Sequence, residues 1–222
     1  MVLGLLGAAA VAHAEFSATV TGVSDYDFRG SSQSAKDPAI QGSVDYAHDS
    51  GWYIGAWASN VDFGDDTDYE LDLYTGFSGE TAGGMGWDAG IVYYTYEESD
   101  FNYPEIYLGL SFGMFSGKLS YSNDWVASDE DALYLQGDAS VPLPADFSLD
   151  LHLGYSFGSY FSDRDTEYFD YSVGVGYTLG KFDLALKYVD TDLDEGDFWF
   201  SSDDVFNTEG RVIFSVSTTF PW

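Results

Sequence analysis

Apolar and polar residues alternate with a period of two along most of this chain. In the segment 147–157, FSLDLHLGYSF, every second residue from Phe147 to Phe157 is aromatic or leucine, and the residues between them are Ser, Asp, His, Gly and Ser. Residues two apart share one face of an extended strand, whereas a helical period matches few of these positions. The segment is therefore predicted to be a long β-strand with one apolar and one polar face.

The alternation recurs from one end of the chain to the other and predicts about twelve strands, an even number that is typical of bacterial barrels. The predicted strands span residues 16–28, 40–46, 52–63, 69–77, 87–96, 106–112, 118–125, 133–141, 147–157, 169–177, 182–188 and 211–222. The orientation of strand 52–63 stays open because apolar residues occupy both faces, with Trp52 on one and Trp57 on the other.

The connections indicate how these strands are joined. Short turns such as HDSG (48–51) and TLGK (178–181) alternate with longer polar segments such as RGSSQSAKDP (29–38). In an open sheet the last strand would be an exposed edge, whereas a closed barrel pairs it with the first strand. We predict an all-β fold: a single closed antiparallel transmembrane β-barrel of about twelve strands, with ten or fourteen strands as alternatives.

A soluble β-sandwich also has alternating strands and polar loops, but its strands usually run to about 5 or 6 residues, shorter than several predicted here. Aromatic residues near the predicted strand ends suit the interfacial girdles of a membrane barrel. They are Trp52, Trp87, Tyr177, Phe220 and Trp222 at one end, and Tyr26, Tyr96, Trp125 and Tyr188 at the other.

Residues 1–14, MVLGLLGAAAVAHA, contain an apolar run followed by the small-x-small pattern Ala12-His13-Ala14. This pattern is typical of a secretory signal peptide, although no positive charge precedes the run, and a short buried N-terminal segment is the alternative. The run is too short to cross a bilayer as a helix. We expect 1–14 to be a signal peptide and 15–222 to be the barrel, exported to the outer membrane of a Gram-negative cell.

Composition restricts the functional classes. The chain has 38 acidic and 7 basic residues and a formal net charge of −31, which excludes a nucleic-acid partner. Its 18% aromatic and 45% hydrophobic content argues against disorder. With no segment long enough for a transmembrane helix, a membrane protein of this composition is expected to be a barrel.

The alternation also assigns side chains to the lumen. The candidate pore-lining acids are Asp25, Asp27, Asp45, Glu70, Asp72, Asp88, Asp138, Asp150, Asp170 and Asp183; the other candidates are Arg29, Lys118, His152, Lys187 and Arg211. Acids outnumber bases, so a narrow lumen would have a negative potential and favour cations. Arg29 is expected to pair with a carboxylate such as Asp27, to form a constriction, or simply to cap its loop.

No catalytic residue and no cofactor are expected. His152 and the pair Glu70 and Asp72 are more simply pore lining than acid–base groups. The acidic stretch DTDLDEGD (190–197) offers closely spaced oxygen donors but does not match the spacing of a calcium-binding loop. We therefore expect the acidic loops to form a solvated surface of mutually repelling charges, with weak binding of divalent cations as the alternative. Phe198, Trp199, Phe200 and Phe206 in the long loop 190–209 are expected either to contact a partner or to fold back as a plug.

Several segments resemble the TorF-type porins, a proteobacterial family. They are SDYDFRGSSQS, DPAIQGSVDYAHDSGWYIGAWASNVDF, NYPEIYLGLSF, YSNDW, DLHLGYSFG and GRVIFSVSTTF. The resemblance implies an outer-membrane barrel and a pore, in contact with the lipid bilayer and assembled through its C-terminal strand. Members of that family end at the equivalent of Phe220, so the assembly machinery would read either Phe220 or the added Trp222.

Three functions follow from these patterns. The first is an outer-membrane channel for passive diffusion of small solutes, with a preference for cations. The alternative is a structural or adhesive barrel with a plugged lumen. A barrel hydrolase is the least favoured, and we expect the protein not to be an enzyme.

Overall fold

The computed structural model describes residues 15–97, 100–193 and 204–222. The segment predicted to be a signal peptide, 1–14, lies outside these residues. No helix in the described part of the chain is long and apolar enough to cross a membrane.

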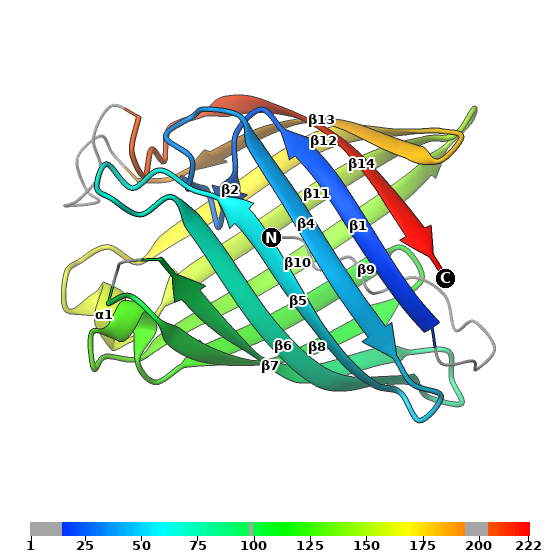
Figure 1. Ribbon diagram of the computed structural model, residues 1–222, viewed down its shortest axis with the longest axis horizontal. Helices are drawn as coiled ribbons and strands as arrows, with labels where there is room; N and C mark the ends of the chain where they lie inside the picture. The colour runs from blue at the N-terminus through cyan, green and yellow to red at the C-terminus, as the bar shows by residue number, and fades with distance from the viewer. Residues whose placement is uncertain (1–14, 98–99, 194–203) are drawn as a thin grey trace.

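Twelve antiparallel strands form a closed barrel, as the sequence predicted (Figure 1). The strands are β1 (Glu15–Val23), β4 (Ala39–Ala47), β5 (Trp52–Asn60), β6 (Tyr69–Glu80), β7 (Gly86–Tyr96), β8 (Tyr103–Phe112), β9 (Phe115–Ser122), β10 (Ala132–Leu143), β11 (Phe147–Phe157), β12 (Tyr168–Leu179), β13 (Phe182–Thr191) and β14 (Arg211–Pro221).

Strands β1 and β14 close the barrel. Their register places Ser17 opposite Pro221 and Val23 opposite Ser215. Beyond the strand, the backbone N–H of Trp222 donates to the Phe16 carbonyl at 2.9 Å, and the Phe16 N–H donates to the Trp222 carbonyl at 3.2 Å. Closure therefore satisfies the backbone groups of the last strand, which an open sheet would leave as an exposed edge.

The outside of the wall is apolar and the inside is polar, the reverse of a soluble protein. On β8, Ile106 and Leu108 point outward and are 54% and 53% exposed. Tyr103 and Glu105, on the other face of the same strand, are 1% and 2% exposed. The same alternation settles the orientation of β5, where Tyr53 and Ser59 are buried inside and Ile54 is exposed outside. An apolar outer band around a polar interior is the arrangement of a membrane-spanning barrel.

Short and long connections lie at opposite ends of the barrel. The short turns (48–51, 81–85, 113–114, 144–146 and 180–181) share one end with residues Glu15 and Trp222; we call it the short-turn end. The longer connections (24–38, 61–68, 97–102, 123–131, 158–167 and 192–210) lie at the long-loop end. Gly180, with φ +64°, allows the two-residue turn between β12 and β13.

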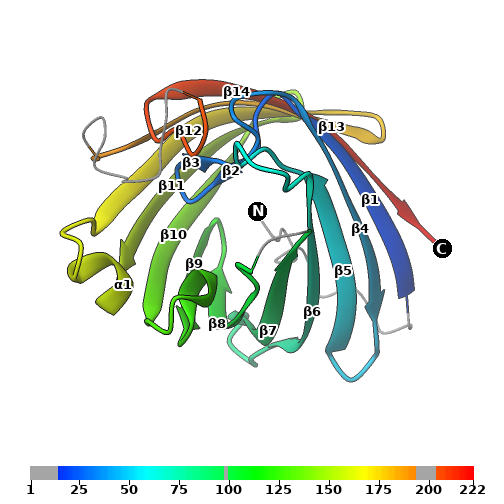
Figure 2. The same cartoon turned by 60° about the vertical axis from the view of Figure 1, so that its left-hand side comes forward.

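The first connection, residues 24–38, folds into the barrel, and we call it the inserted loop. It contains a small hairpin of β2 (Asp27–Phe28) and β3 (Ser31–Ser32), which Figure 2 shows inside the ring of strands. The predicted continuous strand 16–28 is therefore wrong beyond Val23. The chain leaves the wall there and reverses at Arg29 and Gly30, where φ is +52° and +82°.

Further aromatic residues fill the long-loop end. The turn η1 (Trp125–Ala127) and the short helix α1 (Ser159–Ser162) bring Trp125, Tyr160 and Phe161 into one buried cluster. Strand β9 ends at Ser122, so the predicted strand 118–125 is too long. Tyr26, Tyr96 and Trp125, which were predicted for a lipid-facing girdle, pack inside the barrel instead, because they contact inner side chains such as Glu70 and Phe28.

Candidate functional site

The predicted lining residues point to the inner side of the wall or reach it from the inserted loop. Twelve come from wall strands: Asp45 on β4, Glu70 and Asp72 on β6, Asp88 on β7, Lys118 on β9, Asp138 on β10, Asp150 and His152 on β11, Asp170 on β12, Asp183 and Lys187 on β13, and Arg211 on β14. Asp25, Asp27 and Arg29 belong to the inserted loop, not to a wall strand. Their contribution to a pore stays a prediction.

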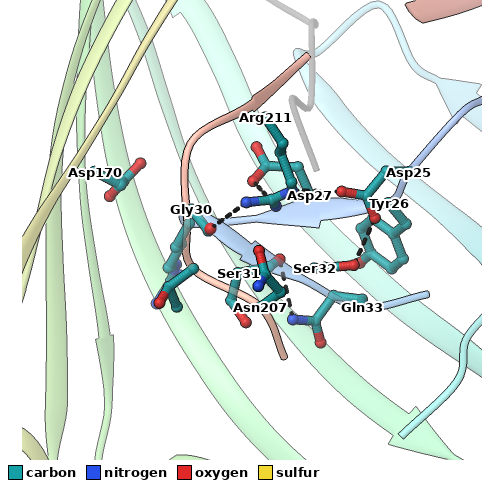
Figure 3. A network of polar contacts seen from close by, with 12 residues as sticks. Asp25, Tyr26, Asp27, Gly30, Ser31, Ser32, Gln33, Asp170, Asn207 and Arg211 are labelled. Atoms are coloured by element: carbon teal, nitrogen blue, oxygen red, sulfur yellow. Dashed lines mark hydrogen bonds and ion pairs between the residues drawn. The ribbon is translucent and has the colours of Figure 1, made fainter. Parts of the chain in front are cut away.

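One edge of the inserted loop is held by two bases of the wall, of which Figure 3 shows Arg211. The guanidinium of Arg211 donates through Nη2 to Asp27 at 2.8 Å and through Nη1 to the Gly30 carbonyl at 2.8 Å. It also donates through Nε to Asp25. On the neighbouring strand, Lys187 Nζ donates to the other oxygen of Asp27 at 2.8 Å. We call Asp25, Asp27, Lys187 and Arg211 the latch.

The latch keeps Asp27 ionised. Burial alone would raise the pKa of this carboxyl group, but the positive charges of Lys187 and Arg211 outweigh burial, so the pKa of Asp27 lies below its ordinary value. The negative charge of the loop and the positive charges of the wall therefore stabilise each other at neutral pH.

The opposite edge of the loop is held by Arg29. Its guanidinium donates to the Glu105 carboxylate at 2.5 Å, and the side chains of this pair are 8% and 2% exposed. Its guanidinium carbon lies 4.7 Å from the ring centroid of Phe28, 4.9 Å from that of Trp125 and 4.3 Å from that of Tyr134. We call Glu105, Phe28, Trp125 and Tyr134 the Arg29 cage.

Arg29 thus pairs with a carboxylate of the interior, as one of the expectations had it, but its partner is Glu105 and not the example Asp27. The turn at Arg29 and Gly30 points the two side chains to different walls, Asp27 to β13 and β14, and Arg29 to β8. Burial opposes the charge of Arg29, but the Glu105 carboxylate more than offsets it, and the pKa of Arg29 lies above its ordinary value. The loop thus crosses the interior: its negative Asp27 is held by two bases on one side of the barrel, and its positive Arg29 by Glu105 on the other.

Further contacts fix the rest of the loop. Tyr26 donates its hydroxyl to Glu70 on β6 at 2.9 Å, and Tyr168 on β12 donates to the Arg29 carbonyl at 2.8 Å. The Ser32 N–H donates to the carbonyl of Asn207, at the described end of the last loop, at 2.9 Å. Phe206 of that loop packs against Phe63, with ring centroids 4.8 Å apart. Phe198, Trp199 and Phe200 lie outside the described residues.

A cluster around His152 spans the three neighbouring strands β10, β11 and β12. Its Nδ1 is 2.6 Å from Asp138, and its Nε2 is 2.9 Å from Asp170 and 3.0 Å from the Tyr134 hydroxyl. The sequence placed His152, Asp138 and Asp170 on the inner face, and the structure brings them together. No serine or threonine hydroxyl in the described residues hydrogen-bonds His152, so the cluster lacks the geometry of a histidine-activated nucleophile.

The interior differs between its two ends. Toward the long-loop end, Glu70, Asp72, Glu105 and Asp170 are at most 2% exposed beneath the loop and the aromatic cluster. Toward the short-turn end lies a cavity of about 1040 Å³. Its polar lining includes Ser140, Ser148, Asp150, Asp183, Ser215 and Ser217. A solvated acidic cavity thus adjoins a filled half-barrel.

Sequence reasoning missed Glu105 and the inner tyrosines. Tyr53 hydrogen-bonds Asp88 at 2.6 Å, and Tyr74 hydrogen-bonds Asp45, so tyrosines hold two of the predicted lining acids against the wall. The signal for Glu105 was its position one residue before the strand assigned to 106–112, on the same face as Tyr107. Within the described ranges, no group of three or more His, Cys, Asp or Glu side chains is arranged to hold a metal ion, and half of the acidic segment 190–197 lies outside those ranges.

Residues 7–220 match a family described as "Bacterial protein of unknown function (Gcw_chp)". The chain belongs to this family. The Gcw_chp match does not include the TorF name, which stays an expectation. Among curated proteins, none matches this Gcw_chp member.

Two solved porins and a solved outer-membrane protein share the barrel of this Gcw_chp chain. The KdgM porin has a TM-score of 0.56 at 8% identity, covering 92% of this chain and 98% of that chain. The NanC porin has a TM-score of 0.57 at 9% identity, covering 91% and 98%. Omp33 of Acinetobacter baumannii has a TM-score of 0.56 at 10% identity, covering 94% and 99%. At these identities the similarity establishes the fold.

Proposed function

We propose that this Gcw_chp protein is an outer-membrane channel through which small solutes diffuse passively, with a preference for cations. The observation that carries the proposal is a closed barrel, apolar outside, with an open, acid-lined cavity of about 1040 Å³ at its short-turn end. The fold shared with the KdgM and NanC porins supports the same function.

The preference for cations rests on which charges are solvated. Of the four lining bases, Arg29, Lys187 and Arg211 are each within 4 Å of a carboxylate oxygen, so their charges are largely neutralised. Lys118 lies over the ring of Tyr107, at 5.7 Å from its centroid, and does not line the cavity. Asp150 and Asp183 line the cavity, and none of the residues that line it is Lys or Arg. Aspartates facing a confined aqueous space concentrate cations and repel anions.

The fold alone does not assign a solute. One similar structure is described as the KdgM porin in complex with disordered oligogalacturonate, which is a polyanion. A polyanion would be repelled by Asp150 and Asp183 in this chain. We therefore propose that this chain shares the barrel of the KdgM porin but does not conduct an anionic solute.

The location and partners belong to the same proposal. The protein is exported by residues 1–14, lies in the outer membrane of a Gram-negative cell, and is inserted by the assembly machinery through β14. Phe220 and Trp222, at the end of that strand, are 41% and 70% exposed and accessible to a recognition factor. Nucleic acid is not among its partners, and it carries out no catalytic step.

The test is the reversal potential of the purified protein in a planar bilayer under a salt gradient. We expect a cation-selective value, and a shift toward zero in the double variant Asp150→Asn with Asp183→Asn. The matched control is Asp163→Asn with Asp165→Asn, which removes the same charge from the outer connection 158–167 and leaves the cavity unchanged. An anion-selective value would overturn the cation preference.

A barrel with a closed lumen is the second candidate, and it is favoured by the burial of the inserted loop and of Glu70, Asp72, Glu105 and Asp170. The two candidates differ in conductance. A channel conducts whenever the loop is displaced, whereas a structural barrel stays silent in the wild type and in variants that release the loop. Silence in all of them would favour the structural barrel.

A further inference from the structure

The cage around Arg29 has the composition of a binding site for an organic cation. Three aromatic rings lie within 4.9 Å of the guanidinium carbon, and the Glu105 carboxylate accepts a hydrogen bond from Nη2. Aromatic faces attract cations through their quadrupole, and a desolvated carboxylate adds charge and a directed acceptor. A surface ion pair needs none of these rings.

The wall supplies most of the cage without the loop. Glu105 belongs to β8, Tyr134 to β10 and Trp125 to the turn that follows β9, whereas the loop supplies only Phe28 and Arg29 itself. Trp125 is supported from behind by Tyr103, with ring centroids 4.8 Å apart, and Tyr94 hydrogen-bonds the second oxygen of Glu105 at 3.4 Å. The site is thus built into the barrel, and Arg29 enters it from a hairpin turn.

We propose that this cage is a binding site for small organic cations that carry a guanidinium or ammonium group. Arg29 occupies the site as part of the chain, and a solute displaces it. The proposal deepens the proposed function, on which it rests, by naming a class of cationic solute. When Arg29 leaves, Glu105 keeps its hydrogen bond from Tyr94 but loses the cation that pairs with it, which favours capture of another cation.

Removal of the Arg29 side chain tests the site. Arg29→Ala leaves a space of the shape of the lost side chain, and methylguanidinium is the probe. Calorimetric titration of the variant in detergent micelles is expected to give saturable one-to-one binding. Wild-type protein should bind about 10-fold more weakly or worse, because Arg29 occupies the cage in all but a minor fraction of molecules. This measurement needs no conduction, so its failure is distinct from failure of the channel proposal.

Two controls make the result specific. Arg29→Ala with Glu105→Gln keeps the space and removes the carboxylate, and its binding should be lost. Arg164→Ala is matched to Arg29→Ala because Arg164 also stacks on a tyrosine, at 4.2 Å from the Tyr160 centroid, and pairs with Glu130. That pair is about 30% exposed on the rim, so Arg164→Ala should gain no site.

Folding provides a second measurement if Arg29→Ala refolds poorly. Millimolar methylguanidinium, but not the same concentration of sodium, should then restore the yield of folded barrel, measured by heat-modifiable gel mobility. Absence of both saturable binding and rescue would overturn the proposal. Binding that persists after Glu105→Gln would also overturn it, because the carboxylate would not be the recognition group.

Discussion

Arg211 and Asp27 lie 184 residues apart in the sequence and meet at 2.8 Å, so the last strand of the barrel holds the first loop inside it. Lys187 shares the same carboxylate from the neighbouring strand. One aspartate of the loop is therefore the meeting point of two wall cations, and its chemistry decides how firmly the loop is docked.

Neutralising that aspartate should release the loop. Asp27→Asn removes the charge that faces Lys187 and Arg211 and costs docking about 1–3 kcal/mol, between the values for exposed and buried pairs. An effect of that size raises the undocked population roughly 5–150-fold. We expect higher conductance and faster tryptic cleavage after Arg29. Asp37→Asn, an exposed aspartate of the same loop, is the matched control and should change neither.

Acid should have the same effect as Asp27→Asn. The pKa of Asp27 is lowered in the docked state, so its contribution to docking is fully present above the ordinary value of 3.8 and is lost as the pH falls through the lowered value. Conductance should be constant from neutral pH down to about pH 5 and rise below about pH 4. In Asp27→Asn this acid-induced rise should be much smaller; an equal rise would assign it to other carboxyl groups.

Gly30 should tolerate no side chain. A Cβ atom there would lie 2.4 Å from Thr191 Cγ2 and 2.8 Å from Asp170 Cβ, and φ is +82°. Gly30→Ala should therefore undock the loop and raise conductance. Gly84→Ala is the matched control, since its φ of +78° imposes the same backbone strain with nothing within 4 Å. It should cost about 1 kcal/mol and leave conductance unchanged.

The outer face should reject charge if it contacts lipid. Leu108 is 53% exposed and lies near the middle of β8. Leu108→Arg should lower the free energy of unfolding in lipid vesicles by about 2–4 kcal/mol if the residue lies near the bilayer midplane. Leu108→Ile is the conservative control. An arginine tolerated at no cost would mean that this face does not contact hydrocarbon.

Periodicity predicted the barrel well because every wall strand has to present an apolar face to lipid and a polar face inward. Segment 147–157 was located to the residue, and β5 was ambiguous only because its inner face also has aromatic residues, Tyr53 and Trp57. A strand pattern records which face a side chain takes, so it also placed Asp138, His152 and Asp170 inside.

The inserted loop could not be predicted in this way. Its alternation simply continues that of β1 through Asp25 and Asp27, and nothing local marks the point after Val23 where the chain leaves the wall. Its docking depends on contacts far away in the sequence, with Glu105, Lys187 and Arg211. Tyr26 and Trp125 were misplaced for the same reason, since an aromatic near a strand end can face lipid or pack inward.

The strand that closes the barrel also holds the inserted loop. Arg211 starts β14, the strand that completes the ring by pairing with β1, so the residue that retains the first loop is delivered together with the final seam. Before β14 has joined, the loop lacks the Arg211 contacts to Asp25, Asp27 and the Gly30 carbonyl, while Lys187, Glu70, Tyr168 and the cage can still hold it. Closing the ring and docking the first loop therefore depend on the same strand, and we expect the loop to dock fully only once β14 has paired with β1.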